Sequence, residues 1–413
     1  MADLLGGKRF VGMDIHRDYA VMVGVSAPNV CVLNARRVEY GKLRDWMKAN
    51  LSASDEVVIE ATMNSWAIYD QVKPFVAQVW VANARKIGLI AQAAVKTDAH
   101  DALHLANLLS AGLLPTVWVP PPPVREMRKI VAHRMTLTKR RTMAINHIRS
   151  ILNEHTLTQP ADLLKIEDWL AEAEKALSCA DRLVIADELT SLRQFKTSIT
   201  QAEAELARLS NSDTWREQAI QVMQVSGFGI VHGMTALAAI GDIKRFANPD
   251  ALASYSGLCP RKHQSGQKND DGRITKEGRK EFRHALIQAA RQAIRTDPYW
   301  TSEHARLTKH TSSQKAVVAI ARKFAVILWH VLTKHEGCKS AGDELLAQRF
   351  SRLRIWLRRH DIQVLPNRFF IRQCLQRIGR ASTLTKFAYG ARQRRIADAD
   401  ELSAYLAVHP QFG

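Results

Sequence analysis

The chain has 413 residues, which at about 150 residues per domain gives room for two to four domains. Its hydrophobic fraction of 46% and charged fraction of 24% are typical of a globular protein with a sizeable core, so wholesale disorder is excluded. The five cysteines are scattered and form no CxxC pair, which argues against a disulfide framework or a zinc knuckle. The N-terminus lacks a signal-peptide pattern, and no uninterrupted apolar run reaches the about 18 residues of a membrane span. We therefore expect a cytoplasmic protein without a membrane partner.

The positive charge is concentrated in the second half of the chain. The formal net charge is +19. Residues 1–122 carry 12 basic and 11 acidic side chains, and residues 123–215 carry 14 and 13; residues 216–337 carry 19 and 10, and residues 338–413 carry 14 and 6. A basic excess confined to particular segments is typical of proteins that bind phosphate backbones, because neutralising phosphates releases counterions. We therefore expect a nucleic-acid partner rather than an anionic lipid surface.

The first 122 residues predict an α/β domain. Val- and Ile-rich alternating segments predict strands at 9–15, 19–25, 30–39, 55–62 and 76–83, with helices at 41–51 and 65–73 and helical sequence up to Leu114. Three strands joined by short turns, followed by alternating helices and strands, predict a mixed sheet covered on both faces, as in the RuvC and ribonuclease H class. The proline run at 120–123 ends this domain as a stiff linker.

The rest of the chain is predicted to be mainly helical. Residues 123–215 predict a helical, coiled-coil arm, because apolar side chains recur at helical spacing among basic ones. The apolar positions are Val124, Met127, Val131, Ile145, Ile148 and Leu152, and the basic ones are Arg125, Arg128, Lys129, Arg134, Lys139, Arg140 and Arg141. Such an arm is either a spacer or a dimerising element with a basic side on nucleic acid. Residues 216–337 form a further domain closed by a helix at 312–335. Residues 338–413 form a basic extension, either a nucleic-acid-binding element or a cap.

Four carboxylates in the first domain predict a metal site. Asp14 lies in the first strand, Glu60 at the end of the fourth, and Asp98 and Asp101 in KTDAHDA at the start of a helix. The first and fourth strands of such a sheet are adjacent, so these side chains can converge at one edge. Clustered like charges need divalent cations, and oxygen ligands suit Mg²⁺, with Mn²⁺ as a substitute. The alternative is that each helical Asp only complements the helix dipole.

Three histidines lie near these acids in the sequence. His100 and His104 have the i,i+4 spacing of a zinc site, but no third soft ligand accompanies them. We expect these residues, together with His16, to face solvent or to support the acids from behind.

Two features of residues 216–337 suggest phosphate contacts. Gly227 and Gly229 form a short turn between apolar helices, which either presents backbone N–H groups to a phosphate or is only a tight turn. Farther on, a loop carries Ser265 between clustered cations. A serine hydroxyl becomes a nucleophile only when its neighbours stabilise charge, and composition alone favours a turn residue at this position. The cations expected to bind nucleic acid are Arg261, Lys262, Lys268, Arg273, Lys276 and Arg279.

The sequence resembles the DEDD-type insertion-sequence transposases, also called bridge-RNA-guided recombinases. The matching motifs run in order over about residues 9–335: GMDIH, VVIEAT, KTDAHDALHLA, VSGFG, IGDIKRF, LASYSGLCPRKHQSG, GRITKEGR and KAVVAIARKFAVILW. The family has an N-terminal RuvC-like domain and a C-terminal transposase domain. Residues beyond about 338 lie outside the resemblance.

The resemblance implies roles that composition does not. Asp14, Glu60, Asp98 and Asp101 would be the Mg²⁺ ligands, and Ser265 would be the catalytic serine that forms a covalent link to a DNA phosphate. The partners would be donor and target DNA, an element-encoded noncoding RNA that selects sequences, and further copies of the chain in a dimer or tetramer with a composite active site. The setting would be bacterial cytoplasm, with the active protein on the nucleoid.

Two other functions remain open on the residues alone, and a third is disfavoured. A RuvC-like nuclease or junction resolvase would use water, and Ser265 would then be structural. A non-catalytic nucleic-acid-binding protein would need neither the acids nor the serine for chemistry. A sugar-kinase-like ATPase is disfavoured, because no glycine-rich phosphate loop follows Asp14.

Overall fold

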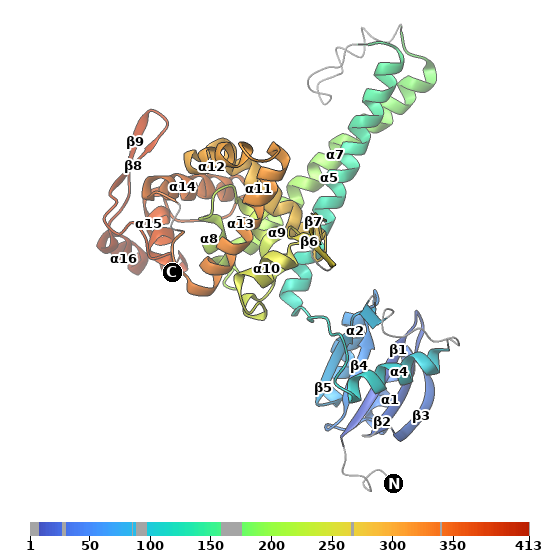
Figure 1. Ribbon diagram of the computed structural model, residues 1–413. Coiled ribbons are helices and arrows are strands. Elements are labelled where there is room, and N and C mark those ends of the chain that lie inside the picture. Colours follow the sequence, from blue (N-terminus) through green and yellow to red (C-terminus); the bar gives the residue numbers. More distant parts are fainter. Residues whose placement is uncertain are drawn as a thin grey trace. The chain divides into compact units, whose positions relative to one another are not determined.

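The computed structural model divides the chain into two compact units, Met1–Pro121 and Pro122–Gly413 (Figure 1). The structure describes residues 8–26, 30–84, 86–87, 97–157, 176–265, 268–338 and 341–412, and for 262–265 and 268–271 it describes the backbone alone. The finer division into four domains at residues 122, 215 and 337 stays a prediction.

The first unit is built on a five-stranded mixed sheet. Its elements are β1 (Arg9–Ile15), β2 (Tyr19–Ser26), β3 (Val30–Glu39), α1 (Tyr40–Asn50), β4 (Glu56–Glu60), α2 (Ser65–Val72), the 3₁₀ turn η1 (Lys73–Phe75), β5 (Gln78–Ala82) and α4 (Asp98–Ser110). The strand order is β3-β2-β1-β4-β5. The first three strands pair antiparallel, and β4 pairs parallel with both β1 and β5. The predicted mixed sheet is therefore confirmed.

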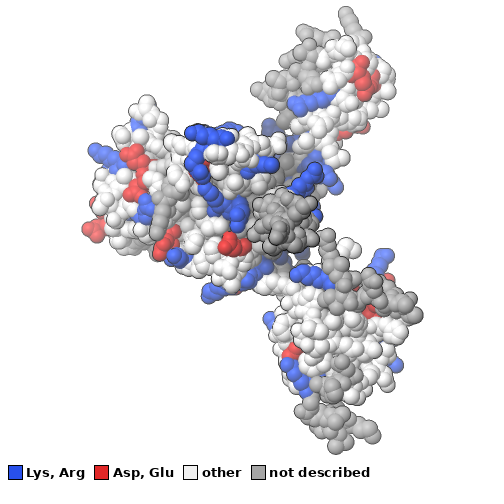
Figure 2. All heavy atoms as spheres, viewed as in Figure 1, with Lys and Arg blue, Asp and Glu red and all other residues white. Residues whose placement is uncertain are grey.

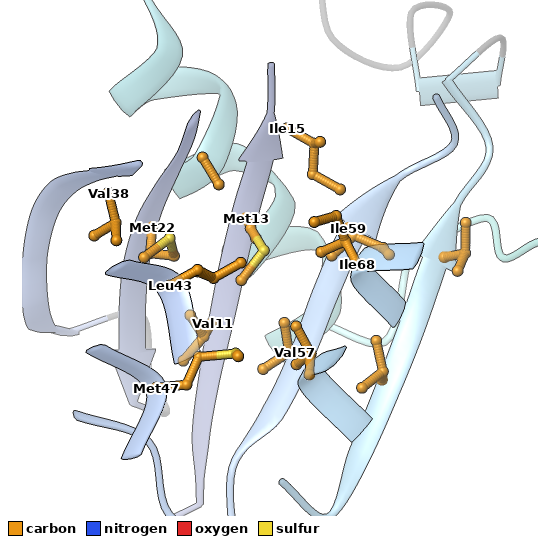
Figure 3. Packing of buried hydrophobic residues seen from close by; sticks show 14 residues of the cluster. Val11, Met13, Ile15, Met22, Val38, Leu43, Met47, Val57, Ile59 and Ile68 are labelled. Atoms are coloured by element: carbon orange, nitrogen blue, oxygen red, sulfur yellow. The ribbon is translucent and has the colours of Figure 1, made fainter. Parts of the chain in front are cut away.

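Successive side chains of each strand point to opposite faces of the sheet, and both faces are packed against helices. Val11 and Met13 of β1 pack with Ile59 of β4 against Leu43 of α1 and Ile68 of α2 (Figure 3). On the opposite face, helix α4 covers β1, β2 and β4, where its buried leucines meet Val58. Since side chains alternate along a strand, the residues next to Met13, namely Gly12 and Asp14, belong to the α4 face.

The ends of several elements differ from the predicted ranges. The strand expected at 55–62 is Glu56–Glu60. Asp55 instead belongs to the preceding turn, where its carboxylate accepts a hydrogen bond from the Ser52 N–H and forms an ion pair with Arg9. The helical sequence expected up to Leu114 contains α4, which begins after Thr97, whose side chain caps the His100 N–H. Residues 85 and 88–96 of that stretch lie outside the described part of the chain.

The second unit is mainly helical. Its elements are α5 (Pro122–Glu154), α7 (Cys179–Ser210), α8 (Arg216–Met223), α9 (Ile230–Ile240), η3 (Ile243–Arg245), α10 (Pro249–Tyr255), β6 (Pro260–Ser265), β7 (Lys268–Ile274), α11 (Lys280–Thr296), α12 (Pro298–Thr308), α13 (Ser313–Lys334), α14 (Asp343–Arg359), α15 (Asn367–Arg377), β8 (Lys386–Tyr389), β9 (Arg392–Arg395), α16 (Ala399–Val408) and η4 (Pro410–Phe412). No disulfide joins the five cysteines, all of which are described.

Helices α5 and α7 form the expected arm as a hairpin within one chain (Figure 1). Ile148 and Leu152 of the predicted apolar stripe are buried against Ile185 and Leu189 of α7, whereas Ile145 is only partly buried. Arg134 pairs with Glu203 across the hairpin, and Arg128 donates to the Ala238 and Ala239 carbonyls at the end of α9. The stripe is therefore used inside the molecule, and dimerisation through the arm stays a prediction.

Helix α13 is the central helix of this unit. By length and composition it would suit a membrane span, with a mean hydropathy of 1.7 over its most apolar window. Eight of its residues, among them Phe324 and Leu328, are buried against neighbouring helices, so its apolar character is accounted for by packing.

The segment after residue 338 packs into the second unit. Arg349 of α14 is largely buried and donates to the Gln224 carbonyl and to Asp297 at 2.8 Å, and it also contacts Ser226. Arg380 bonds the Cys338 and Ala341 carbonyls. The Arg349 contacts join this segment to the α8–α9 turn and to the junction of α11 with α12.

A substitution at Gly12 tests the packing of α4 on the sheet. A Cβ at this position would lie 1.8 Å from the Ala102 carbonyl oxygen of α4. We expect Gly12→Ala to lower the free energy of unfolding of the first unit by about 3 kcal/mol, because backbone would have to move. Gly41→Ala is the matched control, since nothing lies within 4 Å of its added Cβ. Urea denaturation measures both, and equal midpoints for the two variants would contradict the packing argument.

His232 makes the stability of the second unit depend on pH. Burial, together with the charges of Arg134 and His284, lowers its pKa from 6.5 to about 4. The folded form thus binds a proton less readily than the unfolded chain. Stability is fully present above pH 6.5 and is lost as pH falls toward 4, by up to about 3 kcal/mol. His232→Gln should flatten this part of a plot of urea midpoint against pH. The exposed His310→Gln should not, and identical slopes would refute the prediction.

Candidate functional site

The carboxylates Asp14 and Asp98 meet at the end of β1. Asp14 is the sixth residue of the strand, and Asp98 opens α4 on the same face of the sheet. The side chains are 11% and 44% exposed, respectively. The close approach of α4 to Gly12 is what allows the first turn of the helix to reach Asp14. The structure therefore brings these two predicted residues together.

The sheet register also brings Glu60 to this edge. Met13 pairs with Ile59 in the parallel β1–β4 ladder, so the next residues, Asp14 and Glu60, lie level at the ends of their strands. Val58 faces α4, and Glu60, two residues on, belongs to the same face. Asp101 lies in the first turn of α4, near enough for its charge to act on Asp14. The expected convergence of first and fourth strands is thus present in the backbone.

His16 connects the two carboxylates. Its Nε2 lies 2.9 Å from Asp14 Oδ2 and 3.2 Å from Asp98 Oδ2. The ring stacks on Tyr19 at 4.5 Å between centroids, and the Tyr19 hydroxyl donates to Asp98 at 3.0 Å. Tyr40 donates its hydroxyl proton to the His16 carbonyl. Sequence reasoning placed His16 near the acids but missed Tyr19; the signal was the Asp-x-His-x-x-Tyr spacing, which leads around the β1–β2 turn.

The electrostatic environment of Asp14 is crowded. Burial raises the pKa of its carboxyl, the neighbouring His16 lowers it, and the charges of Asp101 and Asp98 raise it again. The hydrogen bond to Asp98 likewise raises the pKa of Tyr19. A buried carboxylate beside two others is unfavourable without a positive charge, so the site favours a cation.

His100 and His104 do not join this cluster. His100 is exposed, as expected, and its backbone N–H is capped by Thr97. His104 Nε2 and Asn107 Oδ1 are buried and have no hydrogen-bond partner in the structure. Within the described residues, the one group of three side chains that could hold a metal is Asp14, His16 and Asp98.

The donor atoms of this group suit a divalent cation. One ligand atom from each residue lies within 4.8 Å of the others. Two carboxylates and one imidazole form a mixed oxygen and nitrogen set, which fits Mn²⁺ and, through the carboxylates, Mg²⁺. Glu60 and Asp101 border the group and could complete the coordination.

The Gly227–Gly229 turn lies between α8 and α9, as predicted. Gly227 has a φ of +81°, and a Cβ there would lie 1.9 Å from the Ala289 carbonyl oxygen of α11. Glycine at 227 is therefore required by backbone conformation and by packing on α11. Gly229 is exposed and precedes α9 without a side-chain cap. Phosphate contact by the two glycines stays a prediction.

Ser265 lies at the end of a β-hairpin rather than on an irregular loop. Strands β6 and β7 pair antiparallel, with Ser265 opposite Lys268 and His263 opposite Asp270. The loop expectation is wrong here, because pairing from Pro260 to Ile274 satisfies the backbone groups of the segment. Lys262 and Lys268 are placed on this hairpin by their backbone alone.

The remaining predicted cations lie on the hairpin strands or shortly after them. Arg261, Arg273 and Lys276 are exposed, and Arg279 precedes α11. Figure 2 shows further Lys and Arg side chains gathered over α11 and α12. An exposed basic surface of this kind suits a phosphate backbone.

Two family models match the chain in the regions just described. Residues 11–156 match the model of IS110-type DEDD transposases, and residues 219–306 match the model of the IS116/IS110/IS902 transposase family. The first match contains all four predicted acids. The second contains the Gly227–Gly229 turn and the whole β6–β7 hairpin.

Several curated proteins are similar over long stretches. The transposase for insertion sequence element IS1111A of Coxiella burnetii is 28% identical over 249 residues, 58% of this chain and 68% of that protein. A probable family 20 transposase of Pseudomonas aeruginosa is 29% identical over 285 residues, 64% of this chain and 83% of its own length. The pilin gene-inverting protein of Moraxella bovis is 25% identical over 344 residues, 79% and 97% of the two chains.

The carboxylate edge predicts binding of a divalent cation. We expect Mg²⁺ or Mn²⁺ to raise the thermal midpoint of the first unit, since the cation relieves carboxylate repulsion. Asp14→Asn and Asp98→Asn should each reduce this rise by more than half. The control is Asp18→Asn, an acid that is 84% exposed and whose charge partner is Arg17. Differential scanning calorimetry with and without the metal measures the effect, and an equal rise in all four proteins would rule out the site.

Proposed function

This chain belongs to the IS110 family of DEDD-type insertion-sequence transposases, and we propose that it cuts and rejoins DNA through a serine-linked intermediate. The observation that carries the proposal is that one chain contains both a carboxylate cluster and a basic hairpin that bears a serine. Each lies inside its own family-matched segment. The two parts supply the two requirements of phosphoryl transfer, charge neutralisation and a nucleophile.

We infer that the first unit is a RuvC-like catalytic domain. Its strand order, with β1 central and β4 parallel beside it, is the order expected for the ribonuclease H class. Asp14, Glu60, Asp98 and Asp101 would hold Mg²⁺, and Tyr19 and His16 would orient the carboxylates of Asp98 and Asp14. When bound, the ion supplies Lewis-acid stabilisation of charge on the phosphate oxygens.

Ser265 would act as the nucleophile. Its Oγ attacks the scissile phosphorus, a new O–P bond forms, and the bond to the leaving sugar oxygen breaks. The serine proton passes to a base, and the leaving oxygen takes up a proton. The exposed Arg261, Arg273 and Lys276 would help to neutralise the phosphates of the bound DNA. Because the phosphoserine link conserves the energy of the broken bond, rejoining needs no high-energy cofactor.

The remaining parts of the proposal concern partners. Donor and target DNA are the substrates, and an element-encoded noncoding RNA would choose the sequences by base pairing. A dimer or tetramer would combine the acids of one copy with Ser265 of another. The charge of residues 216–413, with 33 basic against 16 acidic side chains, supports nucleic-acid binding by the second unit.

Trapping the covalent intermediate tests this function. Labelled donor and target DNA are mixed with the protein and its co-purified RNA, and denaturing gels then reveal protein-linked DNA. We expect Ser265→Ala to lower adduct and joined product by at least about 1,000-fold. Ser254→Ala, an exposed serine on α10, should leave both unchanged.

Two outcomes would overturn the proposal in different ways. Strand cutting that persists in Ser265→Ala without an adduct would favour a nuclease or resolvase that uses water. Cutting and joining that persist in Asp14→Ala and Asp98→Ala would leave the acids without a catalytic role.

A further inference from the structure

A cavity in the second unit lies between the Gly227–Gly229 turn and the C-terminal segment. Its volume is about 270 Å³, and its walls come from the first turn of α9, the end of α11 and one face of α14. This is near the lower end of ligand-binding cavities, so it suits a single nucleotide and excludes a duplex. Neither the predicted acids nor the serine hairpin contributes to it.

The largely buried Arg349 holds α14 against the turn. Its side chain is 12% exposed, and it bonds Asp297, the Gln224 carbonyl and Ser226. Asp297 neutralises its charge, so Arg349 is engaged in structure. The cavity is therefore preformed, because its walls are fixed by a satisfied polar network.

Arg352, one turn farther along α14, supplies a charge that is available for a ligand. It is exposed and lines the cavity, and within the described residues it makes no ion pair and no hydrogen bond. No carboxylate lines the cavity. An uncompensated guanidinium at the mouth of such a cavity favours an anion, and its planar donors match phosphate oxygens.

Trp356 supplies an aromatic wall on the same helix. It is half-buried and contacts His360 at 4.2 Å between ring centroids. Among the described residues its indole N–H has no hydrogen-bond partner. Gln292 of α11 also lines the cavity and offers an amide that can both donate and accept. An arginine one helical turn from a tryptophan places a phosphate site beside a stacking surface, the combination typical of single-strand binding.

We infer that this cavity binds one nucleotide of an unpaired nucleic-acid strand, with the phosphate at Arg352 and the base on Trp356. The inference rests on the proposed function in taking nucleic acid as the partner. It assigns to the C-terminal segment a part in that binding. Unpaired DNA and unpaired RNA share the recognised chemistry, so the measurement compares them.

Anisotropy titration of the full chain tests the site. The probes are fluorescein-labelled oligo-dT, oligo-U and a DNA duplex. We expect Arg352→Ala and Trp356→Ala each to weaken single-strand binding at least about 5-fold, with Trp356→Phe close to wild type. Arg352→Ala should also lower the salt slope by about 0.7, the value for one phosphate of a single strand. The probe that loses more affinity identifies DNA or RNA as the occupant.

A matched control separates the site from general charge. Arg358→Ala removes the same charge from the same helix but lines another cavity, and it should bind close to wild type. Photocrosslinking with iodouridine oligonucleotides should label the peptide that contains Trp356. Unchanged circular dichroism shows that each variant is folded.

The outcomes distinguish this inference from the proposed function. If Arg352→Ala and Trp356→Ala bind single strands with wild-type affinity while joining depends on Ser265, the cavity is not a nucleotide site. The proposed transposase chemistry then still stands. If both variants bind single strands more weakly while joining does not need Ser265, nucleotide binding in the cavity is supported. The proposed role of Ser265 as nucleophile is then wrong. A loss equal to that of Arg358→Ala reduces Arg352 to general charge and also overturns the inference.

Discussion

The close contact between α4 and β1 is the constraint on which the carboxylate edge depends. At position 12, glycine is the only residue type that lets the Ala102 carbonyl come this near to the strand, because any Cβ would collide with it. Two residues on, Asp14 belongs to the same face and meets the first turn of the helix. The geometry of the site is therefore set by the backbone, and the side chains need only be acidic.

The edge that results is electrostatically unfavourable in the absence of a cation. Burial and the nearby acids raise the pKa of Asp14, and His16 lies between Asp14 and Asp98 where positive charge is needed. The hydrogen bond from Tyr19 holds Asp98 in place. Sites of this kind favour metal binding over stability, which is typical of phosphoryl-transfer enzymes.

The second unit shows how an extension outside the family-matched segments can join an existing fold. Arg349 reaches from α14 to Asp297 and to the turn after α8, so the C-terminal segment is part of the same packed body. The same helix then presents Arg352 and Trp356 beside that turn. Helix α14 thus carries Arg349, which is engaged in packing, and Arg352, which lines the cavity without an ion pair among the described residues. Composition cannot distinguish the two arginines.

The sequence by itself determined the local elements and the candidate chemistry. Alternation in RFVGMDI and helical spacing in the arm depend on near neighbours, so the strands, the mixed sheet and the paired helix could be predicted. The acids also stood out, because four carboxylates in this strand order have few other uses. The tertiary structure alone decided that His16 bridges Asp14 and Asp98, that Ser265 ends a hairpin, and that α14 closes a cavity beside Gly229. Contacts such as Arg349 with Asp297 join residues far apart in the chain, and no short-range pattern encodes which of many arginines will be buried.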